Sequence, residues 1–535
     1  MRSHRILSLI VLAALILASL PYIVGYAICP PGARFMGLTH NIDDACVYLS
    51  WIRQTADGHI LLRNSFAVEP HPRMQFNLFF FILGWCSRAL HLAPITIYHL
   101  ARILLGAGLL LSVFKFARLF VDDCRSRVGV ILVLTFSSGL SWMFGSPRPP
   151  LSSVDGWQPE AITFLSMYLN PLFLCGQCLM IGTLYYLMRC KESGRIMHAV
   201  LSGVCLLLLA NIHTYDVLTV GAVWSAFLIV LFVTQRRVNV RLIGLSFLAA
   251  AISSPALLYQ RHVYLTDAVY RLRVNTPTPS PEIWSYFAGY GLLGIAAIAG
   301  AVALRKHHKE SLLLLVWSVV GFILPYAPLA QQRKLVMGLQ IPLAILGTLF
   351  VMRWADRGKR ISPFVATLLF VVIAAPSNLQ FLARDTLALT QNETATGMHR
   401  PYLTNQELAG LDWLRAHTSE DKVVLASPDI AIFVPSVSGN LAYAGHWSET
   451  PDYSGKLTNW FLFVDNSTPD EVRARILRNG RIAYFWWNTS FTSIPSMRAD
   501  EPPGPIFNPN DAHYLRQVFA AGPIRIYEVV IGNTE

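Results

Sequence analysis

Two adjacent carboxylates, Asp43 and Asp44, stand in the stretch THNIDDACVYLSWIRQ, which follows an apolar run long enough to cross a bilayer. A carboxylate can act as a general base that takes the proton from a hydroxyl group as it attacks. An acidic residue at a helix N-terminus also stabilises that helix, by about 1 kcal/mol. Capping needs only one such residue, so the pair favours a chemical role, although capping stays open for either residue.

The same loop carries a second polar segment, VEPHPRMQFN, which contains Glu69 and His71. Its two prolines fix the backbone dihedral φ and hold the segment stiffly. A rigid loop can present Glu69 and His71 to a substrate, and Glu69 can help Asp43 orient an acceptor or bind a divalent ion. An ordinary turn into the following helix is the alternative.

More ionisable residues lie at the ends of predicted spans on the same side of the membrane. Charged groups at this depth are costly and are candidates for function, although snorkelling or helix pairing explains any single one about as well. Their convergence on one side is the stronger argument. These residues are His99, Arg102, Glu160, His213, Asp216, Arg333 and Lys334.

The composition sets the class of protein. The chain of 535 residues is 54% hydrophobic and 14% charged, with a mean hydropathy of +0.45, whereas a soluble protein carries roughly a quarter charged residues. The net charge of +12 comes from short basic clusters between apolar blocks, which is the positive-inside pattern of membrane proteins. We therefore predict a polytopic membrane protein and no binding of nucleic acid.

The apolar blocks predict about eleven transmembrane helices. The first keeps the N-terminus cytoplasmic and is read as an uncleaved span, and residues 76–90 are read as a helix lying in the outer interface. An odd count places the C-terminal segment outside, together with the acidic pair. The predicted spans are 6–26, 95–120, 128–144, 172–188, 199–212, 217–233, 242–258, 283–304, 311–326, 335–352 and 363–375.

The chain changes character after the last span. We expect a transmembrane module over residues 1–380 with a large outer loop over 27–94, a linker over 381–400, and a small α/β domain over 401–535. Short apolar runs separated by polar turns predict the strands of that domain. Its segment GHWSET offers His446, Trp447 and Glu449 as a sugar-binding loop, with a plain structural turn as the alternative.

Carboxylates and basic groups on the outer side suit one chemistry, transfer of a sugar from a lipid-linked phosphate. A carboxylate would deprotonate the attacking hydroxyl, and Arg, Lys or His would stabilise the departing phosphate.

An acidic pair after the first span, followed by an interfacial helix and a returning span, resembles the GT-C superfamily of polytopic glycosyltransferases. These include aminoarabinose transferases and protein O-mannosyltransferases, whose catalytic Asp lies in an acidic pair one helical turn before a Tyr. Tyr48 follows Asp44 by one turn, so the resemblance implies Asp44 as the base, with Asp43 as the fallback. The chain is most similar to uncharacterised bacterial proteins of this superfamily, through EPHPR, YHLAR, QPE…NP, QRKLVMGLQIPLAIL and GHWSETPDY.

The resemblance implies an inverting transferase in the cytoplasmic (inner) membrane that uses a polyprenyl-phosphate-linked sugar and a glycan, lipid or protein acceptor. Donor phosphate would be bound by Arg102 and Arg333, supported by His99 and Lys334. A second-loop DxD or EE pattern, common in better-known members, is missing from this sequence, which leaves dependence on Mg²⁺ or Mn²⁺ open. A lipid-linked glycan flippase and a non-catalytic, glycan-binding scaffold are the alternatives, although a transporter should place its ionisable groups near mid-membrane.

Overall fold

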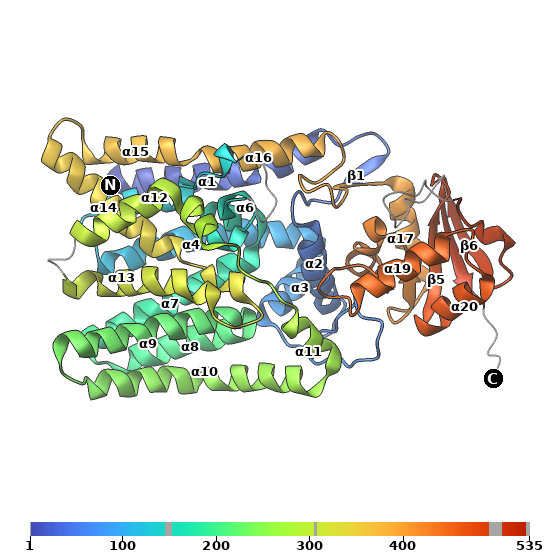
Figure 1. Cartoon of the computed structure of the whole chain (residues 1–535), viewed down its shortest axis with the longest axis horizontal. Helices are drawn as coiled ribbons and strands as arrows, with labels where there is room; N and C mark the ends of the chain where they lie inside the picture. The colour runs from blue at the N-terminus through green and yellow to red at the C-terminus, as the bar shows by residue number, and fades with distance from the viewer. Residues whose placement is uncertain (1, 145–151, 304–307, 492–504, 531–535) are drawn as a thin grey trace. The chain divides into compact units, whose positions relative to one another are not determined.

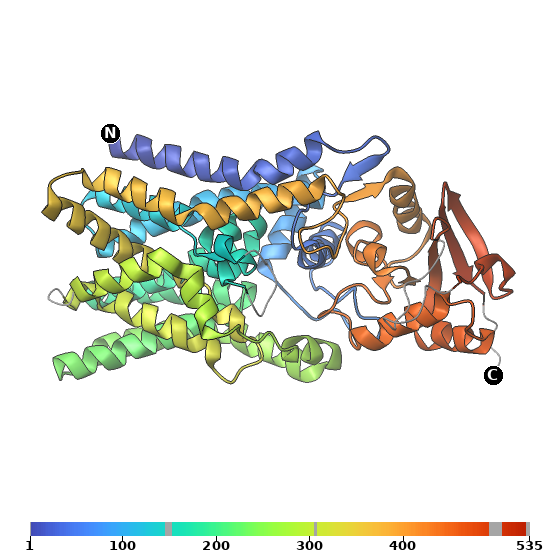
Figure 2. The ribbon, with the colours of Figure 1, turned by 45° about the horizontal axis from the view of Figure 1, so that its top comes forward.

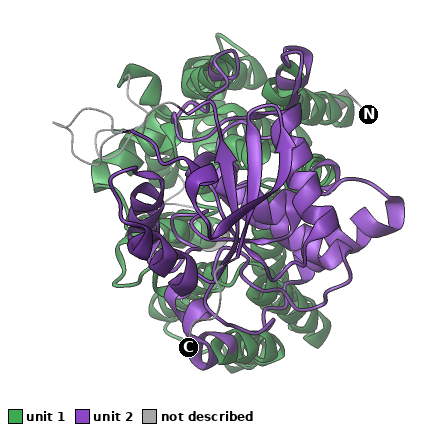
Figure 3. Cartoon of the chain, turned by 90° about the vertical axis from the view of Figure 1, so that its right-hand side faces the viewer, with its two compact units in different colours: residues 1–24, 98–262, 275–387 green, residues 25–97, 263–274, 388–535 purple. Residues whose placement is uncertain are grey.

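The computed structural model describes residues 2–144, 152–303, 308–491 and 505–530. The chain divides into two compact units, coloured separately in Figure 3. The first unit comprises Met1–Val24, Tyr98–His262 and Asn275–Leu387, and the second comprises Gly25–Ile97, Val263–Val274 and Ala388–Glu535.

The first unit is built from long apolar helices that run alongside one another (Figures 1 and 2). Local signals set their ends. In α7, for example, the Asn170 side chain caps the first turn, Pro171 opens the helix, and Gly194 ends it in a left-handed conformation. The helices are α1 (Arg2–Ala27), α4 (Pro94–Phe116), α5 (Cys124–Phe136), α6 (Thr163–Leu169), α7 (Pro171–Ser193), α8 (Ile196–Ile212), α9 (Tyr215–Gln235), α10 (Val240–Thr266), α12 (Ile283–Ala303), α13 (His308–Ile323), α14 (Gln340–Gly358), α15 (Pro363–Ala374) and α16 (Pro376–Leu389).

Short 3₁₀ turns join several of these helices. They are η1 (Ala117–Leu119), η2 (Ser141–Met143), η3 (Val154–Gly156), η4 (Pro159–Ala161), η6 (Leu324–Tyr326) and η7 (Gln332–Val336).

Eight helices in the described part of the chain are long and apolar enough to cross a membrane. The pair α15–α16, bent by 45°, makes a ninth span if it crosses as one. Two further predicted spans are the shorter apolar helices Ile196–Ile212 and Ser311–Tyr326. The predicted helices therefore form, but the count of eleven is reached only if both short helices also cross.

Within the second unit, α2 (Ile42–Ala56) packs against α3 (Leu78–Leu90). The Asn77 side chain accepts hydrogen bonds from the backbone of Phe79 and Phe80, which fixes the start of α3. The helices approach so closely that a Cβ on Gly84 would lie 1.7 Å from Thr55 Oγ1 and 2.5 Å from the Ile52 carbonyl oxygen. The sequence predicted a helix in this region, and its place in the membrane interface stays a prediction.

The C-terminal segment forms a five-stranded sheet in the order β4-β3-β5-β7-β6. Strand β3 pairs in parallel with β4 and β5, and β7 runs antiparallel to both β5 and β6. The predicted C-terminal α/β region is therefore confirmed. The strands are β3 (Val423–Leu425), β4 (Leu441–Ala442), β5 (Ile482–Asn488), β6 (Leu515–Ala521) and β7 (Ile524–Val529); the helical elements are α17 (Asn405–His417), α18 (Pro428–Ala431), η8 (Val434–Ser438), α19 (Tyr453–Val464), α20 (Asp470–Asn479) and η9 (Pro509–Asp511).

Helices cover both faces of this sheet, because successive side chains of a strand point to opposite faces. Phe485 and Trp487 of β5 join a core with residues of α19 and α20. Trp486, between them, meets α17 on the other face, where a Cβ on Gly410 would lie 2.5 Å from its ring.

The loop of residues 27–94 packs with this C-terminal region. Strand β1 (Ala33–Phe35) pairs antiparallel with β2 (Tyr402–Thr404), and the backbone N–H of Ala442 donates to Ser65 O at 3.0 Å. Residues 25–97 thus belong to one compact unit with residues 388–535. The boundaries 1–380, 381–400 and 401–535 stay predictions about domains.

We expect Gly84→Ala to destabilise the protein by about 1–3 kcal/mol, because the new methyl group overpacks the α2–α3 contact. Thermal unfolding of the full-length protein in detergent would measure this. Gly244→Ala in α10 is the control, because nothing lies within 4 Å of the position that its new methyl group would take. Equal melting temperatures for the two variants would contradict the close approach.

A reporter at Asp122, between α4 and α5, and one at Glu535 should lie on opposite sides of the membrane. Asp122 follows two spans and is therefore on the same side as the N-terminus. Nine and eleven spans are both odd, so either count places the C-terminus on the opposite side. Reporters on the same side would show an even count, as expected if the bent pair α15–α16 does not cross.

Candidate functional site

Asp43 and Asp44 lie in the first turn of α2, which begins after Asn41. The helix dipole stabilises negative charge at this end. Asp44 is accessible, with 47% of its side chain exposed, whereas most of the helix behind it is buried. The second unit thus presents a carboxylate on a firmly packed helix.

His446 faces this carboxylate from the loop after β4. Its ring is fully buried, and Nε2 lies 3.5 Å from Asp44 Oδ1. The backbone N–H groups of Ser448 and Glu449 point at Nδ1, at 3.1 and 3.2 Å. In the neutral ring Nδ1 is therefore the acceptor, and in the charged ring both nitrogens are protonated. Either way, Nε2 holds a proton directed at Asp44.

Charge around His446 sets its proton affinity. Burial lowers the pKa of His446, but the contact with Asp44 and the charges of Asp43, Asp44 and Glu449 outweigh burial and raise the pKa above its ordinary 6.5. The two backbone donors on Nδ1 limit that rise, because protonation there would break both hydrogen bonds.

A second histidine, His399, belongs to the same cluster. Burial and the charge of His446 lower the pKa of His399, and the charge of Asp43 raises it. Burial is the largest effect, so the pKa of His399 lies below its ordinary value. Its neighbour Arg400 is fixed by ion pairs to Glu407 at 2.7 Å and Asp429 at 2.6 Å. His399 thus lies near enough to the acidic pair for the charge of Asp43 to act on its imidazole.

Aromatic side chains border the cluster. Trp447 is 42% exposed, and its ring stacks on His446 with the centroids 6.0 Å apart and the planes at 22°. Burial and the charge of Asp43 raise the pKa of Tyr453, so its hydroxyl stays protonated. An exposed indole beside polar groups can stack on the apolar face of a sugar.

Glu449 is fixed by Arg273. Arg273 Nε donates to Glu449 Oε1 at 2.7 Å, Nη1 donates to Gln75 at 2.8 Å, and the guanidinium lies 4.5 Å above the Trp51 ring. This arrangement ties the GHWSET loop to α2. Glu449 is thereby a group that positions the loop of His446.

Glu69 and His71 have partners of their own. Lys456 Nζ donates to Glu69 Oε1 at 2.6 Å. His71 Nδ1 lies 2.7 Å from the Glu69 carbonyl oxygen, and its Nε2 accepts from the backbone of Asn64 at 3.1 Å. Both ring nitrogens thus bind backbone, so His71 holds the loop, and its predicted role in acceptor binding stays a prediction.

The other predicted residues lie in the first unit. Arg102 is 2% exposed; its guanidinium donates to Ala18 O and Met167 O, both at 3.0 Å, and to Ser19 Oγ at 2.9 Å. His99 Nδ1 lies 3.4 Å from Arg102 Nε. These bonds connect α1, α4 and α6, so binding phosphate would require Arg102 to give some of them up.

His213 and Asp216 form a buried pair, with Nδ1 and Oδ2 3.0 Å apart. Lys334 Nζ lies 4.8 Å from the centre of the neighbouring Tyr215 ring. Arg333 stacks over Trp157 at 5.5 Å. Glu160 is 8% exposed and lies in η4.

The described residues hold no group of three or more His, Cys, Asp or Glu side chains placed to bind a metal ion. Glu69, predicted as a possible ligand together with Asp43, is paired with Lys456. A divalent ion held by Asp43 and Glu69 stays a prediction.

Sequence reasoning missed His399 and Arg273. No motif marks His399, which lies far along the chain from Asp43. A signal did exist for Arg273, because it lies in a segment that the predicted topology places outside, where basic residues are uncommon. The same argument singled out Arg333.

No family model matches the sequence, and no curated protein matches it. Solved structures do resemble the fold. An oligosaccharyltransferase from Archaeoglobus fulgidus, tethered to an acceptor peptide, has a TM-score of 0.56 and 13% identity, and the match covers 90% of this chain and 69% of that one. The archaeal oligosaccharyltransferase AglB from Archaeoglobus fulgidus, in complex with an inhibitory peptide and a dolichol-phosphate, has a TM-score of 0.55 and 13% identity over 90% and 70%.

The arabinofuranosyltransferase AftD from Mycobacteria has a TM-score of 0.54 and 14% identity, and the match covers 99% of this chain and 42% of that one. At these identities the likeness is one of fold. Together with the apolar helices, it identifies a multi-pass membrane protein that shares the fold of these solved glycosyltransferases.

Proposed function

We propose that this protein is a glycosyltransferase that moves a sugar from a polyprenyl-phosphate donor to an acceptor hydroxyl on the outer face of the cytoplasmic membrane. The observation that carries the proposal is the accessible Asp44 carboxylate, faced by the buried His446 at 3.5 Å. A carboxylate fixed on a packed helix, yet open to solvent, suits a base that meets its substrate from outside the protein.

Asp44 takes the proton of the acceptor hydroxyl as the oxygen forms a bond to the anomeric carbon. The bond from that carbon to the phosphate oxygen breaks, and the phosphate leaves with the electron pair. Attack opposite the phosphate inverts the anomeric carbon. General-base catalysis of this kind contributes roughly 10²- to 10⁴-fold.

His446 positions Asp44. Its Nε2 proton faces Oδ1, which restricts the rotation of the carboxylate and leaves the acceptor to approach from the exposed side. The exposed Trp447 supplies a stacking surface for a sugar ring. Asp43 adds negative charge close to His446 and His399 and is the fallback base.

For the donor phosphate we propose Arg333 and Lys334, with His99 and Arg102 in support. The first two are only partly buried, whereas Arg102 already donates to three groups of the protein. The fold-related AglB binds dolichol-phosphate, which is support by analogy for a lipid-phosphate donor. Glu160, His213 and Asp216 remain candidates for contacts with the sugar or acceptor.

Asp44→Asn should reduce turnover at least about 10²-fold, because the amide cannot accept the proton. Donor binding and melting temperature should be preserved, because Asn keeps the shape of the side chain and its preference for helix N-termini. Turnover would be measured with purified protein, a labelled polyprenyl-phosphate sugar and cell-envelope acceptors.

The matched control is Glu471→Gln, the same chemical change at an exposed site on α20, and it should be silent. Normal turnover in Asp44→Asn would make Asp43 the general base. Normal turnover in both Asp44→Asn and Asp43→Asn would show that neither residue is the base. Donor binding without any transfer by the wild-type protein would favour the non-catalytic scaffold, and movement of the lipid across a vesicle membrane would favour the flippase.

The two histidines should affect stability with opposite signs as pH changes. His446, with its raised pKa, binds a proton more tightly in the folded protein, so it stabilises the fold below about pH 6.5, and this is lost as pH rises through the raised pKa. His399, with its lowered pKa, destabilises the fold as pH falls, because the unfolded chain takes up the proton more readily.

His446→Gln should therefore lower the melting temperature more at about pH 5.5 than at about pH 8, the range in which histidine titrates. His399→Gln should improve acid stability relative to wild type. Thermal unfolding of the full-length protein across this pH range is the measurement. Asp43, Asp44 and Glu449 are the carboxylates whose charges act on His446, and they are unchanged in both variants. A pH-independent effect of His446→Gln would refute the charging of His446 in the fold.

A further inference from the structure

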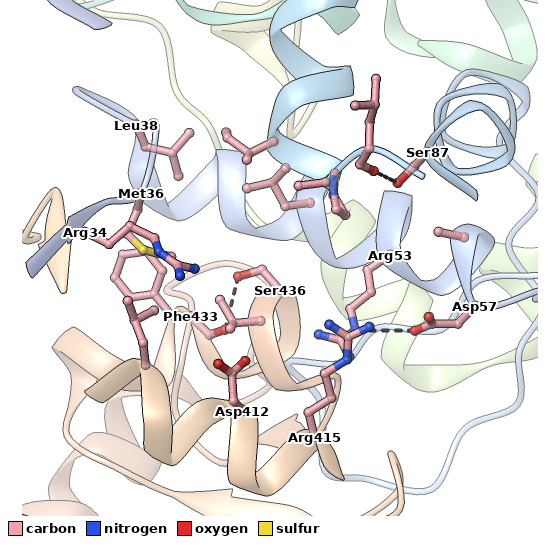
Figure 4. Close-up of a pocket in the computed structure, with 18 of the residues that line it drawn as sticks. Arg34, Met36, Leu38, Arg53, Asp57, Ser87, Asp412, Arg415, Phe433 and Ser436 are labelled. Atoms are coloured by element: carbon pink, nitrogen blue, oxygen red, sulfur yellow. Dashed lines mark hydrogen bonds and ion pairs between the residues drawn. The ribbon is translucent and has the colours of Figure 1, made fainter. Parts of the chain in front are cut away.

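A pocket of about 560 Å³ lies in the second unit at the opposite end of α2 from the acidic pair (Figure 4). Arginines enter it from four elements: Arg34 from β1, Arg53 from α2, Arg88 from α3 and Arg415 from α17. In Figure 4 the guanidinium groups of Arg53 and Arg415 lie together on one side of the pocket, and Arg34 extends from the other side. A volume of this size is typical of a small-ligand site.

The lining is electropositive. Asp57 and Asp412 are its carboxylates, so the four arginines leave an excess of positive charge. Arg53 Nε pairs with Asp57 Oδ2 at 3.3 Å. Burial and the nearby charge of Arg415 lower the pKa of Arg53, and Asp57 and Asp412 only partly oppose this. Several guanidinium groups that line one pocket favour the binding of an anion among them.

Most of the other residues of the wall are apolar, with Ser87, His91 and Ser436 as the polar exceptions. Phe35, Leu49, Leu92, Ile95, Leu408 and Phe433 contribute to it. Leu92 and Ile95 flank the start of α4, which is long and apolar enough to cross a membrane. A free inorganic anion would gain nothing from contact with apolar side chains. A lipid has a charged headgroup for the arginines and an apolar chain for this wall.

The exposed apolar residues of the neighbouring helix α3 indicate that this pocket lies at the membrane surface. The side chains of Ile82, Trp85 and Leu90 are 48%, 61% and 60% exposed. An apolar face with an exposed Trp, on a helix too short to span, is typical of the membrane interface. A pocket lined by residues of this helix is within reach of lipid headgroups.

We propose that this pocket binds the phosphate group of a membrane lipid. Arg34 and Arg415 grip the phosphate oxygens together with Arg53, and the apolar wall receives the first part of the lipid chain. Arg53 lies roughly 13 Å along the helix from Asp44, at 1.5 Å per residue. The site is therefore separate from the candidate base, and it stands whether or not the proposed transfer reaction is correct.

The test uses full-length protein in detergent, titrated with phosphatidylglycerol and followed by native mass spectrometry. Diacylglycerol with the same acyl chains lacks the phosphate and serves as the ligand control. Arg34→Gln with Arg415→Gln should weaken phosphatidylglycerol binding about tenfold or more, as expected for lost charged hydrogen bonds. Both side chains are exposed, so the fold should persist, and the single Arg415→Gln variant is used if the double variant unfolds.

Arg475→Gln, at an exposed site on α20, is the matched control and should bind like wild type. Asp44→Asn should also bind the lipid normally, which separates a failure of this proposal from a failure of the base assignment. Equal lipid binding by wild type and the pocket variants would overturn the site. If inorganic phosphate binds as tightly as phosphatidylglycerol, the claim that the ligand is a lipid is wrong. If diacylglycerol binds as tightly, the claim that the pocket recognises the phosphate group is wrong.

Discussion

The close packing of α2 on α3 is the contact on which both candidate sites depend. A residue without a side chain at Gly84 lets the Thr55 hydroxyl lie 2.9 Å from Phe80 O and 2.9 Å from Ile52 O. The two helices are thereby joined by a buried polar contact as well as by apolar packing. Because α2 is rigid along its length, a shift at Thr55 would move the carboxylates in its first turn and the arginine in its last turn together.

The second constraint is the burial of polar groups around His446. A buried imidazole without partners would cost several kcal/mol; here backbone donors satisfy Nδ1, and Nε2 lies 3.5 Å from the Asp44 carboxylate. Glu449 is held in turn by Arg273. The loop is thus specified by polar contacts with defined directions, which fix a geometry more narrowly than apolar packing does.

Much of the fold could be predicted from the sequence because its signals are local. Blocks of apolar residues predicted the long helices, and short apolar runs between polar turns predicted the C-terminal strands. The exact number of spans could not be predicted, because Ile196–Ile212 and Ser311–Tyr326 are apolar but shorter than the other spans, and hydropathy alone does not decide whether such helices cross.

The candidate site was predicted in its parts but not in its assembly. Asp44 and His446 were each singled out from local motifs, yet nothing in the sequence says that they meet, because a tertiary contact between distant segments has no local signature. His399 was missed for the same reason. Arg102 was predicted to bind the donor phosphate because it is a charged residue near the membrane. Its buried hydrogen bonds to α1 and α6 are a second explanation for an arginine at this position.

The pairing of β1 with β2 has a consequence for biosynthesis. Strand β1 leaves the ribosome long before its partner, and at 5–20 residues per second the residues between them take roughly 20–75 s to make. During that time α2 and α3 can pack against each other, but the C-terminal sheet has not yet been synthesised. The newborn chain therefore shows an unpaired strand edge and an uncovered helix hairpin to the quality-control machinery of the membrane, and any truncation before Tyr402 makes that exposure permanent.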